Sequence, residues 1–339
     1  MTMIPFCNSI DDYLGPGETR FFSKGYRRVE YYVSNIVSSP ADSPDAGAHA
    51  TLSVKYPRDW SKKTNVDLRP HLSSVDTLIL CAQLCEIHLT HAYGLDHNQR
   101  RTMWLRRVKL RAGSTPQEDL DGLTATAKLR QTKEIPNIAN TFLSVYDCQI
   151  GSMQARCEIE HQISLPATTQ AYFGTLEDIL DPSENRYYGE GFKFKGQRIN
   201  DVQLDIEQLH AQASIEIEPT VNAQTIFDGI EGKYQPAISM VDCFVINLQM
   251  AQVLMYELDS IKRSESSTLW MLQTILEAPS PFRPHTGLTV HTSVTGKHLL
   301  QLRGGAWRNI DINGSCGGIQ LSCSLAHALP ATKEFSDAT

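Results

Sequence analysis

The chain repeats itself at a constant spacing of 166 residues, and this internal repeat limits its fold more than any other feature. The segment DYLGPGETRFFSKGY at 12–26 matches DILDPSENRYYGEGF at 178–192, with aromatic residues replacing aromatic residues. At the same spacing, SSVDTLILCAQ from Ser73 matches SMVDCFVINLQ from Ser239. Because this spacing holds over most of the chain without a net insertion, we infer a tandem duplication.

Each half of the chain combines one long apolar helix with several strands. The two units are predicted at 8–165 and 174–330, followed by a flexible tail at 331–339. The helices, predicted at 74–94 and 240–261, are apolar nearly all round, which is typical of a helix buried in a core. Strands are predicted at 27–37, 50–57, 102–111, 122–131 and 141–163, and in the second unit at 213–219, 268–277, 286–303 and 306–327.

A buried helix wrapped by a mostly antiparallel sheet, present twice, is the pattern of a tandem (double) hotdog, an α+β fold. Two ordinary α+β domains of unspecified topology are the alternative that this pattern leaves open. The pair Asn313-Gly314 lies between two alternating segments of the second unit and indicates a hairpin turn.

Composition and motifs exclude several classes of protein. With 31 Lys and Arg against 38 Asp and Glu, the net charge of −7 argues against a nucleic-acid partner. The sequence shows no secretory signal and no clean apolar span, so we expect a cytoplasmic protein without a membrane partner. The eight cysteines form no CxxC pair, and we expect neither a metal site nor disulfides. The signatures GxSxG, P-loop, GxGxxG and HExxH are missing from the sequence.

The candidate catalytic residues lie where the two apolar helices begin. Asp76 and Asp242 match across the repeat; each is either a helix cap or a carboxylate that acts as a general base. His71 has Ala237 as its repeat partner, and it is either a loop residue or part of an acid–base pair with Asp76. Seven residues after each aspartate stands a glutamine predicted to contact substrate, and these are Gln83 and Gln249.

Basic residues distinguish the first half from the second. Arg69, Arg106 and Arg107 have the neutral partners Gln235, Leu272 and Gln273, which suggests that one of the two pseudo-symmetric sites is specialised, with the first favoured. The basic run from Arg100 to Arg111 is either a solvated strand face or a contact for an anionic partner. Arg303 and Arg308 are candidates for a second phosphate contact, whereas Glu18 with Arg20, and Glu184 with Arg186, are predicted to form structural ion pairs.

The sequence resembles the AvrD family, the syringolide synthases of plant-associated bacteria and their actinobacterial relatives. The resemblance rests on YLGPGETRFFSKGYRRV at 13–29, on RPHLSSVD at 69–76 and on a length close to the whole chain. It implies an acyltransferase that joins a β-ketoacyl thioester to a small sugar such as xylulose 5-phosphate and closes the ester to a butenolide. The acyl donor is expected on acyl carrier protein or coenzyme A, with no other cofactor.

Combining the resemblance with the residues, we expect Asp76 to act as general base with His71 assisting, and Asp242 to be its pseudo-symmetric equivalent. The basic cluster is expected to bind phosphate or the carrier protein. Two other classes remain open: a hotdog thioesterase or dehydratase, and a non-enzymatic protein that binds an acyl ligand. A fused pair of units is compatible with a monomer or with a homodimer.

Overall fold

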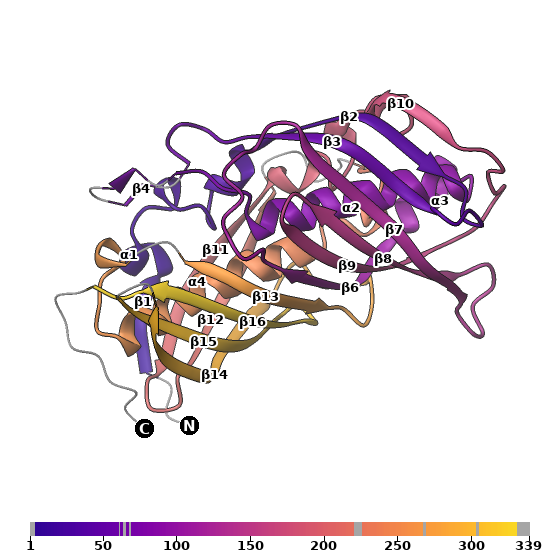
Figure 1. The fold of residues 1–339 in the computed structure, drawn as a ribbon. Coiled ribbons are helices and arrows are strands. Elements are labelled where there is room, and N and C mark those ends of the chain that lie inside the picture. The colour runs from indigo at the N-terminus through magenta and orange to yellow at the C-terminus, as the bar shows by residue number, and fades with distance from the viewer. Residues whose placement is uncertain are drawn as a thin grey trace.

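The computed structural model describes residues 4–60, 62–63, 66–67, 69–219, 226–266, 269–302 and 305–330. Its main feature is one strongly curved sheet of fourteen antiparallel strands that wraps two long helices (Figure 1). This is the predicted tandem hotdog. Within the described residues, no helix is long and apolar enough to cross a membrane.

The strands of the two units follow the repeat. Six strands carry the first unit, in the order β6, β9, β8, β7, β3, β2, and the matching six carry the second, in the order β13, β16, β15, β14, β12, β11. Their bounds in the first unit are β2 Glu30–Ser39, β3 Gly47–Lys55, β6 Trp104–Arg111, β7 Leu123–Glu134, β8 Phe142–Ile150 and β9 Met153–His161. In the second unit they are β11 Lys195–Asp205, β12 His210–Pro219, β13 Trp270–Glu277, β14 Leu288–Leu302, β15 Gly305–Cys316 and β16 Ile319–Ala328.

The units are joined at the centre of the sheet and by an exchange of strands. β6 and β13 pair antiparallel, so the two sheets become one. β1 (Ile4–Ser9) precedes the first unit but pairs with β11 of the second, while β10 (Ala171–Thr175) precedes the second unit but pairs with β2 of the first. Because each leading strand covers the edge of the other unit, the halves are interlocked.

The two central helices begin with the same capping device. α2 (Ser74–Ala92) and α4 (Met240–Leu258) each have a serine at the N-cap, Ser73 and Ser239, which accepts a hydrogen bond from the backbone of Asp76 or Asp242. Each aspartate in turn accepts one from its serine, which completes a capping box. Neither helix has a polar face, and both are buried under the sheet.

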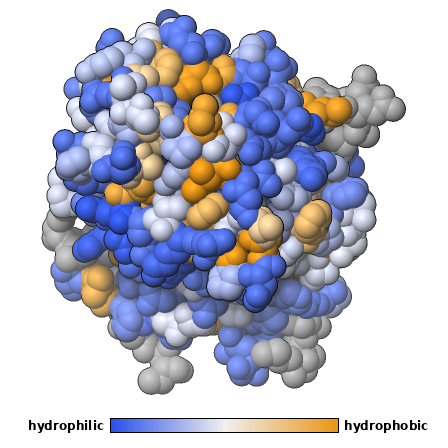
Figure 2. Space-filling model, turned by 90° about the vertical axis from the view of Figure 1, so that its right-hand side faces the viewer, coloured by the Kyte–Doolittle hydropathy of each residue, from blue (hydrophilic) through white to orange (hydrophobic). Residues whose placement is uncertain are grey.

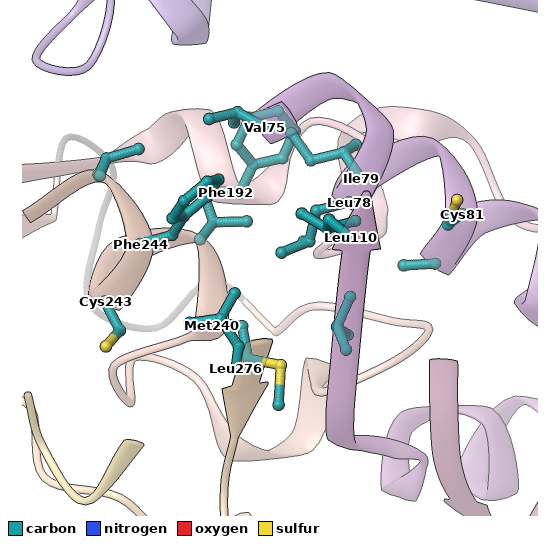
Figure 3. Close-up of a cluster of buried hydrophobic side chains, with 14 of the residues drawn as sticks. Val75, Leu78, Ile79, Cys81, Leu110, Phe192, Met240, Cys243, Phe244 and Leu276 are labelled. Carbon is teal, nitrogen blue, oxygen red and sulfur yellow. The ribbon is translucent and has the colours of Figure 1, made fainter. Parts of the chain in front are cut away.

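The hydrophobic core runs through both units without a break. Figure 3 shows the junction, where Val75 and Leu78 of α2 lie near Met240 and Phe244 of α4, close to side chains of β6 and β13. The end of the molecule seen in Figure 2 carries only small apolar patches among hydrophilic residues. Smaller elements complete the fold: α1 Ile10–Leu14, α3 His97–Thr102 and the short hairpin of β4 Lys62–Lys63 and β5 Val66–Asp67.

The predicted turn at Asn313-Gly314 is wrong, because both residues lie inside β15. The turn is at Gly317 and Gly318, whose φ angles of +55° and +85° match a two-residue hairpin loop that needs left-handed backbone at both positions. Gly314 is required for another reason. The Asn247 side chain of α4 comes so close that a Cβ at position 314 would lie 2.0 Å from Asn247 Oδ1. The predicted tail at 331–339 lies outside the described residues.

Candidate functional site

A cavity of about 470 Å³ lies between the two units, beside the start of α2. The first unit contributes the segment Arg20–Phe22, Trp60, residues 71–74 and the loop 112–117. The second unit contributes Leu248 and Gln252 of α4 together with side chains of β13, β14, β15 and β16. Its wall is mainly apolar, and its volume falls in the range of about 300–1,000 Å³ that is usual for small-molecule sites.

His71 is the one histidine among the described residues that line this cavity. Its ring lies between Trp60 and Trp270, at centroid distances of 5.5 Å and 4.9 Å. Burial lowers the pKa of His71 below its usual value, which keeps the imidazole neutral near pH 7. Nδ1 lies 3.3 Å from the carbonyl oxygen of Arg69. A proton on Nδ1 leaves Nε2 as an acceptor, so His71 is suited to take a proton from a ligand.

Asp76 lies behind the cavity wall and has no exposed surface. Its carboxylate accepts hydrogen bonds from Tyr31 Oη at 2.7 Å, from Tyr56 Oη, and from Ser73 through N at 2.9 Å and Oγ at 2.5 Å. Burial raises the pKa of Asp76 against the effect of these donors. No hydrogen bond joins Asp76 to His71 in the described structure; Tyr56 Oη contacts both the Asp76 carboxylate and the His71 carbonyl oxygen. The expected acid–base pair is therefore not in direct contact.

Asp242 occupies the equivalent position but has a different environment. Lys195 Nζ and Gln197 Nε2 each lie 2.7 Å from its carboxylate, in place of the two tyrosines around Asp76. Burial alone would raise the pKa of Asp242, but the ion pair with Lys195 holds it below its usual value. Asp242 is a buried, paired carboxylate and does not line the cavity at the start of α2.

Two arginines that were not predicted to bind a ligand lie on the cavity wall. They are Arg20 and Arg263, and with His71 they are the only ionisable side chains among the described residues that line it. Arg20 is almost fully buried and donates from Nη1 to Gln249 Oε1 at 2.8 Å. Its other contact is an ion pair with Asp11, and not with Glu18 as expected, because Glu18 pairs with Lys24.

The glutamines predicted to contact substrate instead tie the two units together. Gln83 Nε2 donates to the carbonyl oxygen of Tyr188 at 2.8 Å, and Gln249 Nε2 donates to that of Phe22 at 3.0 Å. The two bonds are equivalent under the repeat. Each helix is therefore anchored to the aromatic opening segment of the other unit, and both side chains are buried in that role.

The other basic candidates do not line the cavity. Arg69 is exposed and pairs with Glu118 at 2.7 Å. Arg106 and Arg107 lie on the outer face of β6 and pair with glutamates of the neighbouring strands, which fits a solvated strand face. Arg308 is buried against Asp259 at 2.8 Å, and His327 approaches the same carboxylate. Arg303 lies outside the described residues.

The equivalent region of the second helix holds two buried ion pairs and a smaller pocket of about 340 Å³, which is lined in part by Arg283. Arg186, the repeat partner of Arg20, faces Glu86 of α2 at 3.9 Å, and both side chains are fully buried. Next to them, Arg283 pairs with Glu231 at 2.9 Å. The two pseudo-symmetric sites therefore differ: the first is a larger and mainly apolar cavity, and the second contains two buried ion pairs.

Two groups of described residues are close enough to hold a metal ion. Cys85, Cys148 and Cys157 form a fully enclosed group in the first unit, and Cys85 Sγ lies 3.7 Å from Cys148 Sγ. His97, Asp181 and Asp228 form the other. In the second group the Arg100 guanidinium already contacts both carboxylates, so a cation is present there. Neither group lines the cavity.

Sequence reasoning missed the position of Arg20 on the cavity wall because its repeat partner made it look purely structural. One difference between the matched helices points to it: Glu86 of α2 is replaced by Gln252 in α4. Where α2 carries a buried acid that faces Arg186, the matching position of α4 therefore carries a neutral side chain.

The chain was compared with known proteins. The sequence model of a family described as Pseudomonas avirulence D protein (AvrD) matches residues 5–330. No curated protein sequence matches. One similar solved structure is a hot dog fold protein of unknown function from Alicyclobacillus acidocaldarius, with 9% identity, TM-score 0.40, and coverage of 85% of this chain and 95% of that one. Another is a putative oleoyl thioesterase from Lactobacillus plantarum, with 8% identity, TM-score 0.38, and coverage of 89% and 96%. A third is the PpsC dehydratase domain from Mycobacterium tuberculosis, with 11% identity, TM-score 0.35, and coverage of 86% and 96%.

Proposed function

Since the chain belongs to the AvrD family, we propose that it is an acyltransferase that joins a β-ketoacyl thioester to a small phosphorylated ketose and closes the product to a butenolide. The observation that carries this proposal is the composition of the cavity. An apolar wall suits an acyl chain, His71 offers a neutral imidazole, and Arg20 and Arg263 offer positive charge, all around one space. A reaction between an acyl donor and an anionic acceptor needs these three properties together.

In the first step, a hydroxyl oxygen of the ketose attacks the thioester carbonyl carbon. A C–O bond forms, the C–S bond breaks, and the thiol leaves with a proton. His71 accepts the hydroxyl proton as general base and returns it to the departing sulfur. Ser73 and Ser74 lie on the cavity wall where α2 begins, so amide groups of its first turn stabilise the oxyanion of the tetrahedral intermediate.

In the second step, the methylene group between the two carbonyls loses a proton to the neutral imidazole. Its carbon then attacks the ketone carbon of the esterified sugar and closes a five-membered ring. The alkoxide formed at the former ketone carbon takes the proton back from the imidazolium. The hydroxyl group then leaves with the remaining proton of the former methylene carbon as water, and a carbon–carbon double bond forms. The net products are one butenolide, one free thiol and one water, and no oxidant or reductant is required.

Asp76 has a supporting role in this proposal. It lies under Ser73 and holds Tyr56, whose hydroxyl group reaches the backbone of His71 at 2.9 Å. The carboxylate therefore fixes the start of α2 and the residue that carries the base, without touching the substrate. Asp242 stabilises the second helix in the same way through Lys195.

Thiol release separates this function from its alternatives. The proposed acyltransferase releases thiol from a β-ketoacyl-coenzyme A at least tenfold faster when xylulose 5-phosphate is present. Equal rates with and without the sugar identify a thioesterase, and loss of water from a β-hydroxyacyl thioester identifies a dehydratase. Saturable acyl binding without thiol release identifies a non-enzymatic binding protein.

A further inference from the structure

The cavity carries a positive charge in a protein whose net charge is −7. Arg20 and Arg263 both line it, and no acidic side chain does so among the described residues. Arg20 is only 3% exposed, and its Nε is buried without a hydrogen-bond partner. A buried arginine normally uses all of its donors, so the protein groups around Arg20 do not satisfy its guanidinium completely.

The charge of Arg20 is only partly compensated. Nη1 donates to the neutral Gln249, and Nη2 pairs with Asp11, whose side chain is 50% exposed. Burial lowers the pKa of Arg20 to about 10, with Asp11 opposing the shift and the charge of Arg263 adding to it. Two like charges held near each other in a mainly apolar space are stabilised by an anion between them.

The second half of the chain shows what a neutralised version of this arrangement looks like. There Arg186, the repeat partner of Arg20, faces the buried carboxylate of Glu86. The repeat partner of Glu86 is Gln252, which lines the open cavity and carries no charge. The partly exposed Asp181, which lies close to this pair, has Gly15 as its repeat partner. The second site therefore has acids at two positions where the first has Gln252 and Gly15.

We propose that Arg20, with Arg263 beside it, binds a phosphate group of the substrate, and that the neutral Gln252, at the position matching Glu86, is what makes this binding possible. The inference rests on the proposed function and adds to it the place where the anion is held. A guanidinium group is suited to phosphate because its planar donors bind two oxygens at once. The phosphate comes from the acceptor sugar or from the phosphopantetheine arm of the acyl carrier, and the two sources are separable by experiment.

The test restores the missing acid. In Gln252→Glu the new carboxylate is positioned to neutralise Arg20 as Glu86 neutralises Arg186, and the fold already tolerates glutamate at the matching buried position. Gln252→Leu is the matched control, because it removes the amide without adding a charge. Calorimetry measures the binding of inorganic phosphate and compares the affinity for xylulose 5-phosphate with that for xylulose, and the affinity for phosphopantetheine with that for pantetheine. Thermal unfolding checks that each variant is folded.

The wild-type protein should bind inorganic phosphate and prefer one phosphorylated ligand over its unphosphorylated form by at least tenfold. Gln252→Glu should abolish that preference, and Gln252→Leu should keep it. The ligand pair that shows this difference tells whether the bound phosphate belongs to the sugar or to the phosphopantetheine arm. Should Gln252→Glu fail to fold, Arg263→Gln at the half-buried position must reduce the preference at least threefold. An unchanged preference in the charged variant, or no preference in the wild type, overturns the inference. If the protein forms butenolide but Gln252→Glu keeps the preference for the phosphorylated ligand, the phosphate site is rejected and the proposed function stands. If Gln252→Glu abolishes the preference but the wild-type protein forms no butenolide, the proposed function is rejected and the phosphate site stands.

Discussion

The imidazole of His71 packs against the indole of Trp270 with their centroids 4.9 Å apart, although the two residues belong to different halves of the duplicated chain. His71 precedes the central helix of the first unit, and Trp270 begins β13 of the second. Both line the cavity, whose wall is therefore shared by the two units. One unit alone does not build the site, which gives a physical reason for the fused chain.

Replacement of His71 by asparagine should reduce kcat by about 10²–10⁴-fold, the usual contribution of a general base. The fold should be retained, because the described contacts of the ring are with two aromatic side chains and one backbone carbonyl. Steady-state kinetics checks this, with the exposed His285→Asn as the matched control. A His71→Asn protein with more than a third of the wild-type kcat would show that the base is another residue.

The pH dependence of turnover follows from the same residue. A general base must be unprotonated, and burial lowers the pKa of His71 below its usual value of 6.5. The expected profile of kcat/KM is therefore flat just above pH 6.5 and falls only at more acidic pH. An acid limb with its midpoint above pH 6.5 would be inconsistent with His71 as the base.

Asp76→Asn separates a positioning role from a catalytic one. Loss of the charge weakens the hydrogen bonds from Tyr31, Tyr56 and Ser73, which should lower the free energy of unfolding by about 1–3 kcal/mol. Turnover should fall less than in His71→Asn, and the acid limb of the pH profile should remain. If Asp76→Asn is as inactive as His71→Asn although it is folded, Asp76 is the base.

Removal of Lys195 should destabilise the protein strongly. Lys195→Met leaves the buried Asp242 without its cation, which should cost about 3–5 kcal/mol in urea unfolding. Adding Asp242→Asn should recover part of this loss, because the unpaired charge disappears. The pKa of Asp242 is lowered in the folded protein, so its favourable contribution is complete above the unfolded value of about 4 and is lost as the pH falls. The variants are therefore compared at pH 7, and equal stability of the single variant and the wild type would contradict the ion-pair account.

The fold could be predicted because the repeat indicates two equivalent units and the apolar helices indicate one buried helix in each unit. The exchange of β1 and β10 between units could not, since pairing between distant segments leaves no local pattern in either strand. The candidate cavity could be predicted only in part. The sequence points to His71 and the start of α2, which line it, but the burial of Asp76 behind Tyr56 depends on packing between β3 and α2. Arg106 and Arg107 look like ligand-binding residues in sequence, and their partners Glu158, Glu160 and Glu277 become neighbours only in the folded sheet.

Mass spectrometry of the purified protein with a β-ketoacyl-coenzyme A and xylulose 5-phosphate tests the central claim most directly. The account predicts a new product whose mass equals the free β-keto acid plus the sugar phosphate minus two waters, formed only when both substrates are present. The same mass should be missing in His71→Asn. Free β-keto acid formed equally fast with and without the sugar, and no joined product, would contradict the account.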